Sequence, residues 1–298
     1  DETISTFIVP RNYAKATSFV LPNIAPGEAP IQHWKNIIPG NGVIINFSTG
    51  LNGGEENVLS AIETIFENNN VELIGGSAGD NLKFKETNVC LNENIFSNAS
   101  VGTLLNIDKS KFNIYKENIY TPTEKYLQAT KVDVEKRIVY EFDGQKASTT
   151  YAKALGIKES ELKDAFFNNP LGLKMGKDII IRSAHTLYPD GSIGFYSQIE
   201  YGSILGILES GNTKEIFQNT INQIKNDFKR LDAVFIVNCI LRKIKFQNEN
   251  LGDIFCQNFK QLTPNITGFC SYGEQIGNKE FGWLHINQTA TIIVFGQK

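Results

Sequence analysis

The chain has 298 residues, of which 41% are hydrophobic and 20% are charged. At roughly 100 to 200 residues per domain this length predicts about two domains, and the composition excludes disordered and fibrous classes. With 29 basic and 32 acidic residues the net charge is −3. The sequence therefore has no electrostatic footprint for a nucleic-acid partner.

Membrane, metal and disulfide signals are absent from the sequence. No apolar run reaches the roughly 18 residues that a membrane-spanning helix needs, and the longest candidate, 233–240, is interrupted by Asn238. The four cysteines and three histidines lack the spacing of metal ligands or of a disulfide framework. We expect no membrane contact by this segment, no metal, no cofactor and a cytoplasmic location.

A β-α-β unit is predicted near the start of the chain. The apolar run 42–48 ends in a glycine-rich turn, and from Glu55 the apolar residues repeat with helical spacing. A second strand follows at 71–74. Further β-like stretches at 83–91, 101–107, 111–116 and 126–142 predict a mixed or antiparallel sheet.

The pattern changes at Asp143-Gly144, so the sequence predicts two domains, 1–145 and 146–298. A helix is expected over 147–155, with Gly156 as its C-terminal cap. A hairpin of 178–188 and 192–199 is expected to turn at Asp190-Gly191.

The last third of the chain predicts one more helix and two strands. Asn212 and Glu215 have capping-box spacing, and the apolar face of the helix runs from Ile216 to Phe228. Residues 232–240 and 283–295 are expected to be buried strands. The predicted fold class is α/β (mixed α+β), with two packed subdomains, each a mixed sheet with flanking helices.

Residues 75–79 satisfy the G-x-S-x-G pattern of a hydrolase nucleophile elbow. An elbow needs a helix directly after the serine, whereas 83–91 alternates like a strand. A serine esterase-like hydrolase that uses Ser77, with His185 or His285 as its base, stays open as an alternative. The other interpretation is a turn that brings the backbone close to a neighbour.

Several polar segments bracketed by glycine lie beside apolar strands, and in their order they resemble the FIST domain, a bacterial sensory module. The segments that carry the resemblance are the glycine-rich 75–80, the junction 142–151, C-x-x-R at Cys239 and Arg242, G-F-x-x-Y-G-E at 268–274 and N-Q-T at 287–289.

The resemblance implies a non-enzymatic sensory input domain of a bacterial signal-transduction protein. It implies a small-molecule ligand, such as an amino acid, and an output domain outside these residues, of the chemoreceptor (chemotaxis), kinase or cyclic-dinucleotide type. The halves implied are FIST N-terminal, 1–145, and FIST C-terminal, 146–298. Family members carry an additional segment before the first half, so this half is expected to be truncated at its start. A protein-interaction module without a ligand is a further alternative.

The ligand is expected between the two halves, because small-molecule pockets often form at domain interfaces. A carboxylate ligand calls for an arginine, which grips it bidentately; Arg242 is the first choice and Arg182 the second. Glu274 and Asp80 are candidates to face an ammonium group, whereas in the alternative Arg242 and Glu274 pair only with each other. The expected binding set is completed by Ser77, Cys239, Tyr272 and Asn287.

Overall fold

The computed structural model describes residues 4–22, 40–176, 178–279 and 282–298. They form an α+β protein that divides into two compact units. Unit 1 contains Asp1–Glu117, Lys214–His285 and Thr289–Lys298, and unit 2 contains Asn118–Thr213 and Ile286–Gln288. Each unit is therefore assembled from segments that are distant in the sequence.

A six-stranded sheet of unit 1 combines early and late parts of the chain. Strands β2 and β3 are parallel and are joined by helix α1, which confirms the predicted β-α-β unit. Strand β18 pairs antiparallel with β3. The order across the sheet is β1 (Lys15–Pro22), β6 (Ala99–Asn106), β2 (Gly42–Thr49), β3 (Val71–Ala78), β18 (Glu274–Asn278) and β19 (Gly282–Ile286), and α1 spans Glu55–Phe66.

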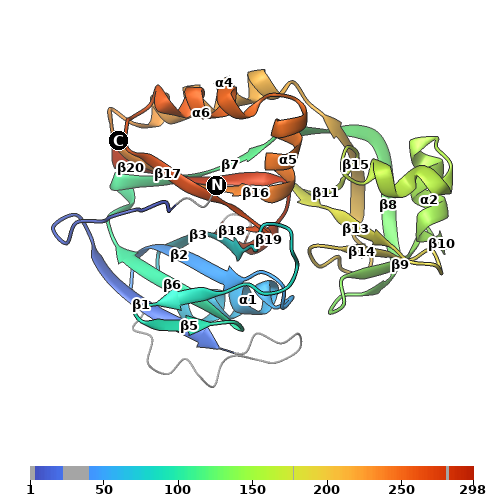
Figure 1. The fold of residues 1–298 in the computed structure, drawn as a ribbon, viewed down its shortest axis with the longest axis horizontal. Helices are drawn as coiled ribbons and strands as arrows, with labels where there is room; N and C mark the ends of the chain where they lie inside the picture. Colours follow the sequence, from blue (N-terminus) through green and yellow to red (C-terminus); the bar gives the residue numbers. More distant parts are fainter. Residues whose placement is uncertain (1–3, 23–39, 177, 280–281) are drawn as a thin grey trace. The chain divides into compact units, whose positions relative to one another are not determined.

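A four-stranded sheet forms the other half of unit 1. Helices α4 and α6 lie over its outer face, and α5 follows β16 directly (Figure 1). Its order is β17 (Ile266–Ser271), β16 (Arg230–Cys239), β20 (Thr289–Gln297) and β7 (Phe112–Asn118), and the helices are α4 (Thr213–Asp227), α5 (Ile240–Asn248) and α6 (Gly252–Lys260).

The two sheets of unit 1 pack face to face through apolar side chains. Ile45 and Ile74 of the larger sheet share a buried cluster with Val237 and Ile293 of the smaller one. On the opposite face of the larger sheet, α1 packs through a second apolar cluster. Unit 1 thus has four layers, helix, sheet, sheet and helices, with a small β4 (Val89–Leu91) and β5 (Asn94–Phe96) ribbon at one end.

Unit 2 is an antiparallel sheet with two short helices packed on one of its faces. Tyr151 of α2 and Phe166, which directly follows α3, meet Phe142 and Phe195 from the sheet in one buried cluster. The strand path is β12 (Asp178–Arg182), β11 (Leu171–Met175), β15 (Ile204–Ser210), β8 (Tyr120–Asp133), β9 (Ile138–Phe142), β14 (Ile193–Phe195) and β13 (Ala184–Leu187), with β10 (Gln145–Lys146) beside β9, and the helices are α2 (Ala147–Leu155) and α3 (Leu162–Ala165).

Two local predictions in unit 2 are confirmed. Helix α2 ends at Gly156, which has a φ of +76° and donates its N–H to the carbonyl of Lys153. The hairpin exists as β13 and β14, and Gly191 at its turn has a φ of +83°. The hairpin is shorter than predicted, because β12 is a separate strand that pairs with β11.

The strand predicted over 83–91 is wrong except for its last three residues. Leu82 and Phe84 have positive φ angles of 62° and 51°, which extended backbone excludes. The Asp80 carboxylate accepts the backbone N–H groups of Phe84 and Lys85, and these bonds hold the segment as a loop.

Three other predicted strands need correction. The strand expected over 283–295 is two strands, β19 and β20, separated by a turn at Asn287-Gln288 in which Gln288 has a φ of 48°. The stretch 126–142 is likewise divided into β8 and β9, with Arg137 at a φ of 55°. Ile240, expected to end a strand, begins α5.

Candidate ligand-binding site

Ser77 lies inside β3 and is fully buried. Its hydroxyl donates to Glu55 Oε1 at 3.0 Å, and its backbone N–H donates to the Gly273 carbonyl at 2.9 Å. A loop follows β3 where an elbow would require a helix. The hydroxyl therefore joins α1 to the sheet and has a carboxylate as its acceptor.

The glycine-rich turns around Ser77 are places of close packing. A Cβ atom on Gly79 would stand 2.6 Å from the ring of Tyr272, and one on Gly273 would stand 2.2 Å from the ring of His285. Gly273 also has a φ of +149°. These glycines let the turns of β3 and β18 approach each other closely.

Asp80 and Tyr272 clamp the loop that follows β3. The Tyr272 hydroxyl donates to Asp80 Oδ1 at 2.6 Å, and the Tyr272 ring stacks on Phe84 with 5.4 Å between ring centroids. Bonds from Tyr272 and from the Lys85 N–H favour the charged carboxylate and hold the pKa of Asp80 well below its usual range. The pair therefore fixes the shape of a loop.

Glu274 is the first residue of β18 and is completely buried. It accepts hydrogen bonds from the Ser271 hydroxyl at 2.7 Å and from the Thr289 N–H at 3.2 Å. Burial, which disfavours the charged form, raises the pKa of Glu274 to about 8, while a hydrogen bond with the Cys239 side chain acts in the opposite direction. Burial therefore favours the neutral form of Glu274.

Arg242 lies in the first turn of α5 with 1% of its surface exposed. Its guanidinium donates to the backbone carbonyl of Glu117 at 2.6 Å and forms an ion pair with the Glu117 carboxylate. The rings of Phe217, Phe246 and Phe255 surround it, with centroids 4.9–5.7 Å from Cζ. The ion-pair partner of Arg242 is Glu117, whereas the sequence analysis had considered Glu274.

Arg182 and Asn287 belong to unit 2, whereas the other six expected residues belong to unit 1. Arg182 is buried at the end of β12 and donates to the Ile181 carbonyl at 3.3 Å. Asn287 Oδ1 accepts a hydrogen bond from the Ser197 hydroxyl at 2.8 Å. In unit 1, Ser77, Asp80, Tyr272 and Glu274 gather where β3 meets β18, and Cys239 and Arg242 lie where β16 passes into α5.

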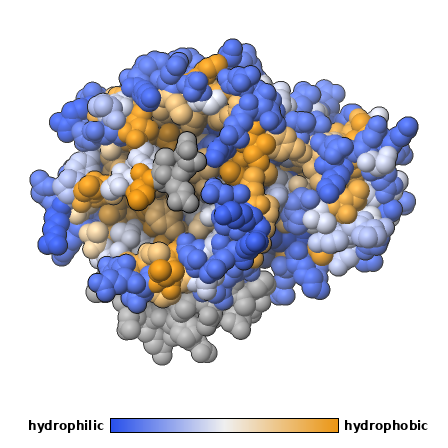
Figure 2. Space-filling model, in the orientation of Figure 1, coloured by the Kyte–Doolittle hydropathy of each residue, from blue (hydrophilic) through white to orange (hydrophobic). Residues whose placement is uncertain are grey.

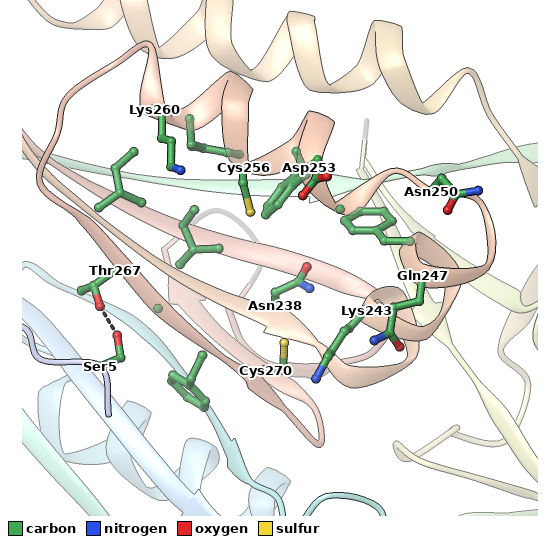
Figure 3. A pocket seen from close by; sticks show the side chains of 18 of the residues that line it. Ser5, Asn238, Lys243, Gln247, Asn250, Asp253, Cys256, Lys260, Thr267 and Cys270 are labelled. Atoms are coloured by element: carbon green, nitrogen blue, oxygen red, sulfur yellow. Dashed lines mark hydrogen bonds between the residues drawn. The ribbon is translucent and has the colours of Figure 1, made fainter. Parts of the chain in front are cut away.

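A cavity of about 810 Å³ lies elsewhere in unit 1, between the strands β16 and β17 and the helices α5 and α6 (Figure 3). Hydrophobic residues show in a recess below these helices in the space-filling view (Figure 2). Two adjacent pairs form its floor, Ile236 beside Gly268 and Asn238 beside Cys270. A Cβ atom on Gly268 would stand 2.1 Å from the Ile236 carbonyl oxygen, so only glycine lets the two strands lie this close.

The opposite wall of the cavity is aromatic and its rim is charged. Phe246, Phe255 and Phe259 lie on that side, with only 4%, 8% and 1% of their surface exposed. Lys243 of α5 and Asp253 of α6 lie at the rim, and both are exposed. None of the ion pairs found in the described ranges involves Lys243, and its charge acts on the Cys270 thiol.

Asn238 is the polar group of the cavity floor. Its side chain is 8% exposed, and its Oδ1 has no hydrogen-bond partner. Its amide interacts instead with the Cys270 thiol, whose pKa is raised by burial and lowered in part by Lys243 and Asn238. A buried acceptor without a donor costs about 1–3 kcal/mol, and a ligand with a donor group would recover this cost.

The sequence analysis missed this cavity because it predicted no helices over 240–260. The available signal was the helical spacing of Phe246, Phe255 and Phe259 on the two sides of Asn250 and Gly252. The C-x-x-R motif nevertheless pointed close to the site. Asn238 and Lys243, which line the cavity, are the immediate neighbours of Cys239 and Arg242.

Comparison with protein families finds the FIST N domain at residues 8–145 and the FIST C domain at residues 147–277. The chain therefore belongs to the FIST family, as its motifs predicted, and FIST domains are sensory domains of signal-transduction proteins. Comparison with curated proteins finds no match. Among the described residues, no group of three histidine, cysteine or acidic side chains is placed to hold a metal ion, and no helix has the length and apolar character to cross a membrane.

Proposed function

We propose that this chain is a sensory input domain that binds a small carboxylate, such as an amino acid, in the cavity between β16–β17 and α5–α6. The observation that carries the proposal is the buried, unpartnered Oδ1 of Asn238 on the floor of a cavity of about 810 Å³. Pockets for small ligands are typically about 300–1,000 Å³ and mainly apolar, with a few polar groups that fix orientation.

The charges at the rim suit a ligand with both a carboxylate and an ammonium group. Lys243 offers a cation without an ion-pair partner in the described part of the chain, and Asp253 offers an anion on the facing helix. In this proposal Lys243 binds the ligand carboxylate, which the sequence analysis expected Arg242 to do. The guanidinium of Arg242 is already bound to Glu117 and is enclosed by aromatic rings.

In the same proposal, the bound domain acts in the bacterial cytoplasm and passes its signal to a chemoreceptor, kinase or cyclic-dinucleotide output domain outside these residues. Support for a signalling role comes from the family, whose domains are sensory.

A thermal-shift screen of amino acids and other small carboxylates tests the proposal. A ligand at about 100 times its dissociation constant stabilises the protein by about 2.7 kcal/mol, which is several degrees in melting temperature. Cys256→Trp on the exposed side of α6 would place an indole in the cavity. Gln257→Trp, one position further on the same helix and outside the lining, is the matched control.

The expected hit shifts the melting temperature of the unmodified chain and of Gln257→Trp but not of Cys256→Trp. A hit that shifts all three proteins equally would locate the ligand elsewhere. The absence of any hit among these carboxylates would contradict the proposed ligand class.

A further inference from the structure

The loop that follows β3 presents two large apolar side chains to solvent. Leu82 has 41% of its surface exposed, and Phe84 has 56%. Leu51, on the turn after β2, is 38% exposed, and a hydrogen bond from the Gly50 N–H to the Thr87 hydroxyl joins the two segments. Single exposed apolar residues are ordinary, whereas a group of them marks a surface to which another molecule binds.

The backbone that carries these two side chains is strained. Leu82 and Phe84 have φ angles of 62° and 51°, and Asn81 before them has a φ of 57°. Asparagine adopts this left-handed region readily, whereas leucine and phenylalanine do so at a cost, because their Cβ atoms crowd the backbone. Residues strained in this way cluster at functional sites. The chain thus keeps bulky apolar residues where asparagine or glycine would fit with less strain.

Asp80 and Tyr272 hold the strained loop in one conformation. The Asp80 carboxylate accepts the N–H groups of Phe84 at 3.0 Å and of Lys85 at 2.7 Å. The Tyr272 hydroxyl accepts the Leu82 N–H and donates to Asp80, and its ring supports one face of Phe84. A surface that is ordered in advance loses little conformational entropy on binding. The two motif residues therefore preserve the shape in which the apolar side chains are presented.

Two lysines alternate with the apolar residues of the loop. Lys83 and Lys85 are exposed, and none of the ion pairs found in the described part of the chain involves either of them. Glu86, which follows, accepts a hydrogen bond from a neighbouring side-chain amide. A surface that covers Leu82 and Phe84 also approaches two ammonium groups, so carboxylates on that surface are attracted and basic groups are repelled.

We infer that the 80–86 loop, together with Leu51, is the docking surface for a protein partner that contributes an apolar pocket with carboxylates at its rim. The net charge of −3 on the chain opposes an anionic membrane as the occupant. The inference rests on the proposed function in one respect, that the chain has a signalling partner. It does not depend on the ligand or on the cavity between β16–β17 and α5–α6.

A phage-displayed library of random dodecapeptides, selected on the immobilised full chain, supplies the probes. The selected peptides are expected to combine Asp or Glu with Leu, Phe or Trp. In calorimetric titration of the synthesised peptides, Phe84→Asn and Leu82→Asn are each expected to weaken binding about tenfold, as for an apolar anchor. Both variants are expected to remain folded in thermal melts, because asparagine accepts the left-handed φ of these positions.

Further variants separate the charge and the shape of the loop from a general effect on the protein. Lys85→Met is expected to weaken the peptides about threefold, and more at low salt than at high salt. Tyr272→Phe keeps both apolar anchors but loosens the loop, and is expected to weaken binding about fivefold. Tyr126→Asn is the matched control, because Tyr126 is an aromatic residue of unit 2 with 55% exposure. It is expected to leave the affinity unchanged, as is Cys256→Trp.

A selection that yields no peptide above background would overturn the inference, and so would a set of basic peptides. Peptides that bind folded Leu82→Asn or Phe84→Asn as tightly as the unmodified chain would overturn it as well, and either variant suffices if the other does not fold. Peptide binding through the loop without any carboxylate that stabilises the chain would leave the docking surface in place and contradict the proposed ligand. The opposite pair of results would contradict the docking surface alone.

Discussion

Replacing Arg242 by Met is expected to lower the free energy of unfolding by about 3–5 kcal/mol, the usual result of removing one partner of a buried ion pair. Both side chains of the Arg242–Glu117 pair have 0% exposure. Without the guanidinium, the Glu117 carboxylate remains buried and loses its counter-charge. Three phenyl rings also lose the cation that they surround.

Urea denaturation at pH 7, followed by far-UV circular dichroism, measures this loss. Arg230→Met is the matched control. Arg230 pairs with Asp232 at 3.0 Å, but 68% of its side chain is exposed, so its loss is expected to cost less than about 1 kcal/mol.

The double variant Arg242→Met with Glu117→Leu removes the stranded charge. It is expected to be more stable than Arg242→Met alone, because apolar replacements of buried ion pairs are often neutral or stabilising. The reasoning is refuted if Arg242→Met costs no more than Arg230→Met, or if the double variant is less stable than the single one.

Three further outcomes follow from the buried polar groups. Tyr272→Phe removes the hydroxyl that holds Asp80, and tryptic cleavage after Lys83, followed by mass spectrometry, is expected to be faster. Burial raises the pKa of Glu274 to about 8 in the folded chain, above its value in the unfolded chain, so the folded state binds the extra proton. The free energy of unfolding is therefore expected to fall by about 1 kcal/mol per pH unit as the pH rises from about 4.5 to 8. Glu274→Gln is expected to flatten this pH dependence in urea denaturation. Ser77→Ala loses its hydrogen bond to Glu55 and is expected to cost about 1 kcal/mol with no change in the hydrolysis of activated esters.

Each of these outcomes has a contrary result. Unchanged cleavage in Tyr272→Phe would show that the loop holds its shape without the hydroxyl. A pH dependence equally steep in Glu274→Gln would assign the titration to another group. Ester turnover that disappears in Ser77→Ala would replace the sensory function with a hydrolase.

The elements predicted correctly are those whose signal is local. The β-α-β unit over 42–78 follows from a change of apolar period, and the cap at Gly156 follows from one glycine in the left-handed region. The loop over 80–86 has no such signal. Its conformation depends on Tyr272, which is 192 positions away from Asp80 in the sequence.

The sequence indicated the neighbourhood of the candidate site but not its contacts, because those contacts join residues that are distant in the sequence. Family motifs identified the neighbourhood of Cys239 and Arg242, but an arginine in a motif does not reveal whether its partner is a ligand or a buried acid. The partner, Glu117, lies 125 positions away from Arg242. Only the three-dimensional contacts show that Lys243, next to it, lines a cavity and has no ion-pair partner in the part of the chain that the structure describes.

The pairing of β18 with β3 has a consequence for the folding of the chain during synthesis and for its truncation. Strand β3 meets a partner that is synthesised about two hundred residues later, so unit 1 completes its larger sheet only after the segment Asn118–Thr213 of unit 2 has emerged from the ribosome. Contacts of such long sequence separation slow folding. Until they form, β3 presents an open edge, which favours association with other chains. A fragment cut at residue 145 would keep that edge permanently, so the first half of the sequence is expected to aggregate when it is expressed alone.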